Sequence, residues 1–252
     1  MPNEEVFPRP TVKQVIFQIV FPNLFYIESS IGEFQKAIME KFPESSLLFR
    51  RHVVFADIAP GKKLEDVEGI PESELGKKIW QFKSSNEFTL NVTTNSLDIT
   101  SQKHESYNSP KSETKFRDVV QFVLDQFFDV TGLPLVKRIG LRYINECPVP
   151  SKDNASFSEY YTTAFPLERF HLENASEMTF ATEIKRGQYF VRYLEAVRME
   201  GGKPSFTLDI DAYCKEIKAK DCLPTADKLH TCIHNEYQTT IKEPVREFMR
   251  QR

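Results

Sequence analysis

Apolar and polar side chains alternate near the start of the chain. From Val15 to Phe21 every second residue is apolar, and Gln18 lies on the opposite side of this alternation. A period of two is that of a β-strand with one buried face. Pro22 cannot continue such a strand because it has no backbone N–H to donate. The pattern therefore predicts a strand over residues 12–21 with Gln18 on its polar face.

Further short segments rich in β-branched and aromatic residues follow. Asn86 and Asn95-Ser96 supply turn residues between the later ones, as in a meander of antiparallel strands. Residues 59–77 are rich in Pro, Gly and Glu, which is typical of a long loop. The segments expected to be strands are 47–58, 78–84, 88–93 and 97–100.

The clearest helical pattern lies between Thr114 and Val130. Gly132 and Pro134 follow it, and both residue types commonly end helices. Apolar residues that recur at i, i+3, i+4 and i+7 form one buried stripe on a helix. The residues of this stripe are Phe116, Val119, Val120, Val123, Leu124, Phe127 and Phe128.

Three other helices are predicted from weaker patterns. An apolar stripe begins at about Thr225 and should break near Thr240, because Pro244 cannot sit inside a helix. Residues 30–33 and 156–159 both match the capping box, in which a Ser oxygen and a Glu side chain satisfy the first free amides of a helix. Two short helices are expected to begin at these sites.

The second half of the chain echoes the first. Phe206–Ile210 is nearly identical to Phe88–Val92, and Val136-Lys137 matches Val12-Lys13 ahead of an apolar run. Together with the order of the predicted helices, these matches indicate a tandem duplication of a β-α-β-β-(β)-α unit. We expect an α+β fold with antiparallel sheets and two principal helices packed on one face. The expected repeats span residues 1–133 and 134–252 within one compact domain, and the expected strands of the second are 136–145, 178–185, 189–197 and 206–212.

Composition narrows the class of protein. Of 252 residues 40% are hydrophobic and 27% charged, and the formal net charge is −3, which differs from the strongly basic charge of a generic nucleic-acid binder. The four Cys residues lack the spacing of a disulfide framework. The acidic start does not resemble a secretion signal, and no apolar run approaches the roughly 18 residues of a membrane span. These features predict a cytoplasmic protein without membrane contact.

A polar sheet face is the main candidate site. By alternation, polar residues of several predicted strands should point away from the side that the helices cover. A concentrated polar face suits a small ligand or a protein partner, and it is also what an ion-paired, solvated surface looks like. The candidate binding residues on this face are Gln18, Asn91, Arg142, Arg192, Asp209 and Asp211.

Some residues have the types and spacing of metal or nucleic-acid sites. His230 and His234 have the i, i+4 spacing of zinc ligands, but the glutamate of the metalloprotease motif is missing after the first of them. Asp209 and Asp211 share one strand face and could hold a divalent cation, with His230 as a further candidate ligand. Basic clusters at 50–52, 137–138 and 185–186 have aromatic neighbours, as in single-strand binding surfaces, although acidic residues are equally dense. We predict no metal, no cofactor and no catalytic residues.

Several segments resemble a sporadically distributed bacterial protein family whose activity is not established. Phe7–Phe17 matches the start of that family, and Ile79–Ser84, Gly140–Asn145 and Leu208–Asp211 match later strands, with Leu229-His230 and Glu236 near the end. The resemblance implies a cytoplasmic α+β protein that is accessory to a system of patchy distribution, such as a toxin–antitoxin or phage-defence locus. It supplies no catalytic residues.

These observations favour a non-catalytic interaction or regulatory protein, antitoxin-like or accessory, whose partner is another protein encoded nearby. Two alternatives remain open. The protein could instead be a small-molecule sensor with a ligand cleft between the repeats, or a metal-dependent hydrolase using Asp209, Asp211 and His230. A sensor predicts an apolar cleft between the halves, whereas an interaction module predicts none.

Overall fold

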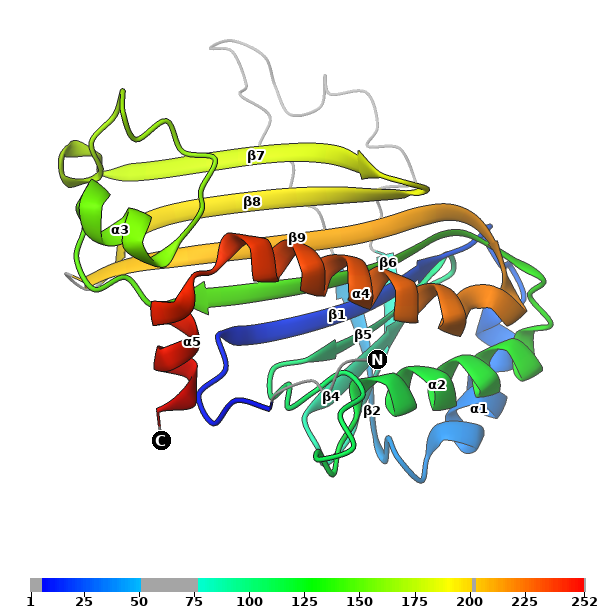
Figure 1. Cartoon of the computed structure of the whole chain (residues 1–252). Coiled ribbons are helices and arrows are strands. Elements are labelled where there is room, and N and C mark those ends of the chain that lie inside the picture. The colour runs from blue at the N-terminus through cyan, green and yellow to red at the C-terminus, as the bar shows by residue number, and fades with distance from the viewer. Residues whose placement is uncertain (1–5, 51–76, 201–202, 252) are drawn as a thin grey trace, which may run out of the picture.

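The fold is built on one sheet that runs through the whole molecule. The computed structural model describes residues 6–50, 77–200 and 203–251, which form a nine-stranded antiparallel sheet and five α-helices (Figure 1). The strand order is β2-β3-β4-β5-β1-β6-β9-β8-β7. The strands are β1 (Val12–Val20), β2 (Glu44–Arg50), β3 (Lys77–Lys83), β4 (Phe88–Val92), β5 (Ser96–Ser101), β6 (Leu135–Cys147), β7 (Glu177–Arg186), β8 (Tyr189–Glu200) and β9 (Lys203–Lys218).

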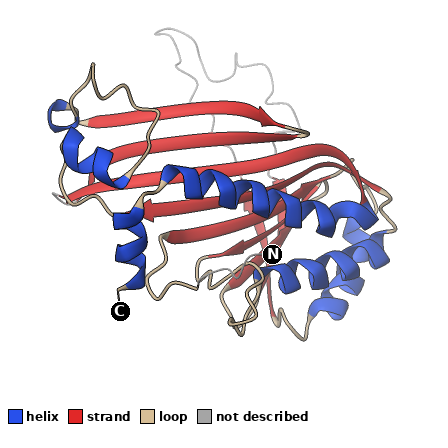
Figure 2. Cartoon of the chain, viewed as in Figure 1, coloured by secondary structure: helices blue, strands red, loops and turns tan. Residues whose placement is uncertain are grey.

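The helices lie in front of this sheet in Figure 1, and Figure 2 shows the same two layers by type of element. They are α1 (Ile27–Ile38), α2 (Phe116–Thr131), α3 (Asn154–Tyr160), α4 (Cys222–Thr240) and α5 (Glu243–Arg250). The predicted α+β class and the antiparallel sheet are confirmed. Among the described residues, no helix has the length and apolarity needed to cross a bilayer.

The alternation at the start of the chain places β1 in the middle of the sheet. Val15, Phe17 and Ile19 are fully buried, as their period predicts. Strand β1 pairs with β5 on one side and with β6 on the other, so that Phe17 lies opposite both Ile99 and Leu141. The two halves of the chain therefore share one continuous sheet through the β1–β6 pair.

Ring contacts show which face the helices cover. Phe34 of α1 packs edge-on against Phe82 of β3 with ring centroids 6.0 Å apart, and Phe116 of α2 lies 6.2 Å from Phe88 of β4. Helix α4 reaches the same face, where its buried Leu229 belongs to the core formed by these rings. The sequence pattern predicted two principal helices on this face, but α1 joins α2 and α4 there.

Both capping boxes were wrong predictions. Ser30 lies inside α1, which begins at Ile27 rather than at the Ser.

 Tyr26 is the N-cap residue of α1 and Ile27 its first helical residue, so the helix starts three residues before Ser30. In α3 the cap is Asp153, whose carboxylate accepts a hydrogen bond from the backbone N–H of Ser156 at 2.8 Å. Asp is as good an N-cap as Ser, and it came three residues earlier in the chain.

The remaining elements lie close to their predicted positions. Helix α2 ends at Gly132, and α4 ends at Thr240, four residues before Pro244. The predicted strand over 47–58 is described only as far as Arg50, and the predicted loop over 59–77 lies almost wholly outside the described residues.

The halves also resemble each other in connectivity. In each of them the first strand pairs with the last, β1 with β5 and β6 with β9. The first half has an additional described strand, β2, at its edge of the sheet. The tandem duplication, with repeats over 1–133 and 134–252, stays a prediction.

The left-handed backbone conformation at the end of α2 can be tested by substitution. Gly132 has φ = 62°, in the left-handed region, and its N–H bonds to the carbonyl of Phe128. A Cβ added there would meet no atom within 4 Å, so the backbone conformation alone opposes a side chain. Gly132→Ala is expected to lower the free energy of unfolding by about 1 kcal/mol, measured by urea denaturation.

Gly32 is the matched control for this substitution. It lies inside α1, and a Cβ there would also meet no atom within 4 Å. Because Ala is the better helix former, Gly32→Ala should raise the free energy of unfolding by about 0.5–1 kcal/mol. Equal effects of the two substitutions would contradict the assignment of Gly132 as a left-handed cap.

Candidate functional site

The six residues predicted for the polar face do lie on one face of the sheet. The strand register places Gln18 of β1, Arg142 of β6 and Asp211 of β9 on the side opposite the helices, and it adds Asn91 and Arg192 from β4 and β8. Asp209 joins them as the next residue on that side of β9. The alternation therefore predicted the geometry of this face correctly.

The charges on this face are paired with one another. Arg142 donates to Asp209 from Nε at 2.8 Å, and Arg138 donates to Asp211 at 2.9 Å. Arg192 pairs in the same way with a carboxylate of the edge strand, Glu183. Each guanidinium of the cluster thus has a carboxylate partner within the protein.

Neutral side chains complete the network. Arg138 also donates to Gln18 at 3.1 Å, and Asn91 donates to Asp98 at 2.9 Å. Burial raises the pKa of Asp211, and the neighbouring guanidinium of Arg138 opposes that rise. An interlocked network of this kind stabilises the sheet and has few groups left to recognise a ligand.

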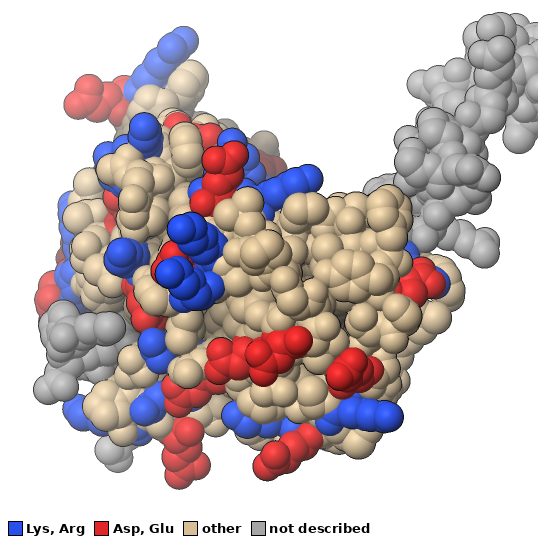
Figure 3. Space-filling view, turned by 90° about the vertical axis from the view of Figure 1, so that its right-hand side faces the viewer, with Lys and Arg blue, Asp and Glu red and all other residues tan. Residues whose placement is uncertain are grey.

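A shallow depression of about 480 Å³ lies over the outer strands of this face, and Arg142, Arg192, Asp209 and Asp211 line it. Its charged walls are the ion pairs just described. Figure 3 shows another side of the molecule, where Lys and Arg are interspersed with Asp and Glu beside a broad uncharged area. Neither surface resembles the continuous basic stripe of a nucleic-acid binder.

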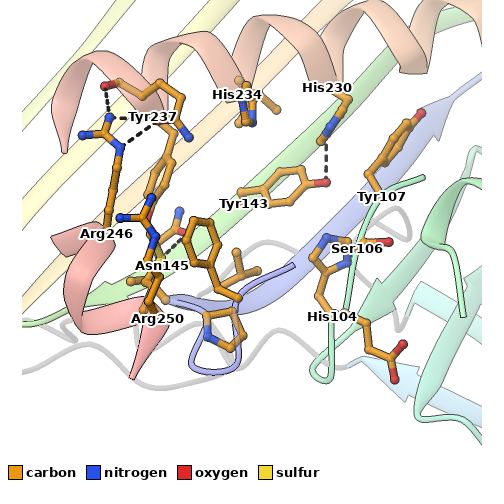
Figure 4. A pocket seen from close by; sticks show the side chains of 18 residues that line it. His104, Ser106, Tyr107, Tyr143, Asn145, His230, His234, Tyr237, Arg246 and Arg250 are labelled. Atoms are coloured by element: carbon orange, nitrogen blue, oxygen red, sulfur yellow. Dashed lines mark hydrogen bonds between the residues drawn. The ribbon is translucent and has the colours of Figure 1, made fainter. Parts of the chain in front are cut away.

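A second cavity lies on the other side of the sheet, under α4. It has a volume of about 390 Å³, and its walls come from four separate parts of the chain. These are the segment 7–12, the loop 104–107, the strand β6, and the consecutive helices α4 and α5 (Figure 4). Hereafter this cavity is called the central pocket.

Helix periodicity brings the side chains of α4 to the central pocket. His230, His234 and Tyr237 follow one another at intervals of four and three residues, which places them on one face of the helix. Strand periodicity does the same for β6, where Tyr143 and Asn145 both point to the helix side. Figure 4 shows these side chains converging from the helix and the strand.

Aromatic rings form one end of the pocket. The Tyr143 hydroxyl and His230 Nδ1 share a hydrogen bond of 3.1 Å, and the His230 ring stacks on Tyr107 with centroids 4.1 Å apart. His104 meets the Tyr143 ring edge-on at 5.3 Å. The rings of three distant segments therefore hold one another in fixed orientations.

A partly buried ion pair fixes this aromatic end. The Tyr107 hydroxyl donates to Asp227 of α4 at 2.9 Å, and Arg117 of α2 donates to both oxygens of the same carboxylate at 2.8 and 3.0 Å. Burial raises the pKa of Tyr107 well above its usual range, so the hydroxyl stays protonated and remains a donor. Asp227 thus holds the loop 104–107 and α2 against α4.

Polar groups in the middle of the pocket satisfy one another. The Thr11 hydroxyl donates to Asn145 Oδ1 at 3.2 Å and lies 2.7 Å from the Tyr237 hydroxyl. Asn145 in turn donates to the carbonyl of Leu208 at 3.1 Å. Burial raises the pKa of Tyr237 far above neutrality, so this part of the pocket carries no charge.

Two arginines of α5 form the other end. Arg246 donates to the carbonyl of Gln238 at 3.1 Å and to its side-chain oxygen at 2.9 Å. Arg250 lies one turn further along α5, on the same side, and pairs with Glu243 at 2.7 Å. The pocket therefore has an aromatic end and a cationic end.

Sequence reasoning found only part of the central pocket. It singled out His230 and His234, but as candidate zinc ligands, and no group of three or more metal-binding side chains occurs among the described residues. Tyr107 lies outside the predicted strands and helices, yet it is only 1% exposed. No local pattern marks Tyr107, because its partner Asp227 is distant in the sequence. Arg246 was missed as well, because only the packing of α5 beside α4 brings it to the pocket.

The role of Asp227 can be tested by unfolding. Asp227→Ala leaves Arg117 and the Tyr107 hydroxyl without their shared acceptor, and the side chains of Asp227 and Arg117 are only 20% and 24% exposed. We expect the free energy of unfolding to fall by about 2–4 kcal/mol in urea denaturation.

The matched control is Glu177→Ala, which removes the carboxylate of an ion pair with Arg198 at the surface, where both side chains are about half exposed. Exposed pairs contribute little, so this variant should unfold close to the wild type. A loss for Asp227→Ala no larger than that of the control would show that Asp227 does not hold the loop.

Comparisons with protein-family models, with curated proteins and with solved structures found no match to this chain. The resemblance of Phe7–Phe17 and Gly140–Asn145 to a bacterial family, and the accessory role in a toxin or defence system that it implies, therefore stay predictions.

Proposed function

We propose that this protein is a non-catalytic regulatory module that binds a small molecule in the central pocket. The single observation that carries the proposal is an aromatic pocket of about 390 Å³ whose walls come from both halves of the chain. Ligand sites are typically concave, of 300–1,000 Å³, and mostly apolar, with a few convergent polar groups. This was the alternative reading of the sequence, which placed a ligand cleft between the repeats.

The geometry also favours a regulatory consequence of binding. A ligand in the central pocket would touch the segment 7–12 and the loop 104–107 from the first half, and α4 and α5 from the second. Contacts across these segments exist only in the folded state, so binding stabilises that arrangement in proportion to ligand concentration. Such a change in stability is one way in which a small molecule controls a partner interaction.

Fragment binding tests the proposal. The probes are phenol, indole, benzoate and benzylamine, and saturation-transfer NMR measures their contact with the protein. At least one fragment is expected to bind wild type with roughly millimolar affinity. His234→Trp should abolish that binding, because the larger ring would fill the pocket from α4.

Asn235→Trp is the matched control, since Asn235 neighbours His234 on α4 but is exposed. It should bind the fragments as wild type does, and thermal melting confirms that both variants are folded. The proposal is wrong if no fragment binds, or if His234→Trp and Asn235→Trp bind equally well.

A second candidate function is the binding of a partner protein at the sheet edge, which was the leading interpretation of the sequence. Strand β7 ends the sheet and pairs only with β8 within the described part of the chain. A ten-residue edge strand can accept a strand from another protein through its free backbone groups. The partner would then be an extended peptide segment.

Proline substitution separates this candidate from the first. Successive amides of a strand point to opposite edges, so either Ala181→Pro or Thr182→Pro removes an outward N–H while the other breaks the pairing with β8. The outward variant should stay folded and lose a partner that tagged wild type retains from bacterial lysate. Retention of that partner by both variants would exclude the β7 edge as the docking site.

A further inference from the structure

The central pocket is polarised along its length, and this polarity indicates the class of its ligand. Figure 4 places Arg246 and Arg250 on one side of Tyr143, and His104 and Tyr107 on the other. One end therefore offers guanidinium groups and the other offers ring faces and edges. The inference below rests on the proposed function, because it concerns the same pocket.

We propose that the central pocket takes a planar aromatic acid, with its carboxylate or phosphate toward Arg246 and its ring toward Tyr143 and His104. Arginine is well suited to this role because its planar fork donates two parallel hydrogen bonds to a carboxylate or phosphate. A planar ring suits the other end because aromatic side chains prefer offset or edge-to-face partners.

Arg246 is positioned to receive an anion. Its Nε and Nη2 donate to Gln238, which carries no charge and fixes the plane of the guanidinium. The nearest carboxylate in an ion pair with it is that of Glu243, 3.7 Å from Nη1, which is too long for a hydrogen bond. Glu243 is also 58% exposed and makes the closer contact of 2.7 Å with Arg250. Among the residues that the structure describes, the charge of Arg246 is thus only weakly compensated.

The partial burial of Arg246 strengthens its attraction for an anion. Its side chain is 24% exposed, so water screens the charge less than it would at an open surface. A carboxylate or phosphate that displaces water there gains a charge-assisted hydrogen bond as well as the Coulomb attraction.

The aromatic end of the central pocket determines the orientation of the ligand. Glu105 lines the pocket from the same loop as His104 and Tyr107, and its carboxylate accepts a hydrogen bond from Ser112 at 2.7 Å. A second anionic group on the ligand would meet this negative charge. Thr11 and Asn145, in the middle, already bond to each other. The ligand should therefore carry one anionic group, at the α5 end, and an uncharged ring.

A matched pair of probes tests the inference. The compounds 2-naphthoate and 2-naphthamide have the same ring and nearly the same shape, and they differ in charge. Isothermal titration calorimetry on wild type should give a dissociation constant for 2-naphthoate at least tenfold lower than for 2-naphthamide. In Arg246→Gln the two constants should become equal within about twofold, with the amide binding as it does to wild type.

Two further variants control the result. Arg198→Gln removes an equal charge at the surface of β8 and should keep the tenfold preference for the acid. Arg246→Lys keeps the charge but loses the fork, and it should show an intermediate preference. If Arg246→Gln is unstable, the role of Arg246 is judged by whether Arg246→Lys has a smaller preference for the acid than Arg198→Gln has.

The outcomes separate this inference from the proposed function. Equal binding of the acid and the amide to wild type would overturn the assignment of an anionic ligand but leave a ligand pocket in place. Preference for the acid that persists in Arg246→Gln, and equally in Arg246→Lys, would overturn the role of Arg246. If neither naphthalene compound and none of the four fragments binds, the central pocket is not a binding site for such ligands.

Discussion

The pairing of β1 with β6 is the contact on which the rest of the molecule depends. It joins the five strands of the first half to the four of the second, and its central residues, Phe17 and Leu141, are fully buried. The same pairing directs the chain before β1 toward the end of β6, which is why Thr11 reaches Asn145. One run of backbone hydrogen bonds therefore builds both the sheet and a wall of the central pocket.

The two faces of the sheet differ in how they use polar groups. On the open face the arginines are neutralised by carboxylates of the next strand, as Arg142 is by Asp209. Under the helices, polar groups are few and come from distant segments, as in the contact of Tyr107 with Asp227. The first arrangement holds neighbouring strands together, whereas the second lines the central pocket.

The fold was largely predictable from the sequence and the central pocket was not. Alternation located β1 and the polar face, and the stripe from Phe116 located α2, because both patterns depend on neighbours along the chain. The second capping box misled because Asp153 takes the capping role in α3, and the first because α1 already begins at Ile27. The burial of Tyr107 could not be predicted, because no pattern nearby in the sequence indicates that α4 covers it. A site assembled from distant segments produces no periodic pattern of apolar and polar residues within any one segment.

The central place of β1 also has a consequence for how the protein is made. Residues 12–20 are synthesised before both of their neighbouring strands and can pair with β5 once Ser101 has emerged, but β6 begins only at Leu135. Until then one edge of a strongly apolar strand has no partner, and such edges invite association between nascent chains. Helix α2, which is completed just before β6, can cover the apolar face of the sheet but not this open edge.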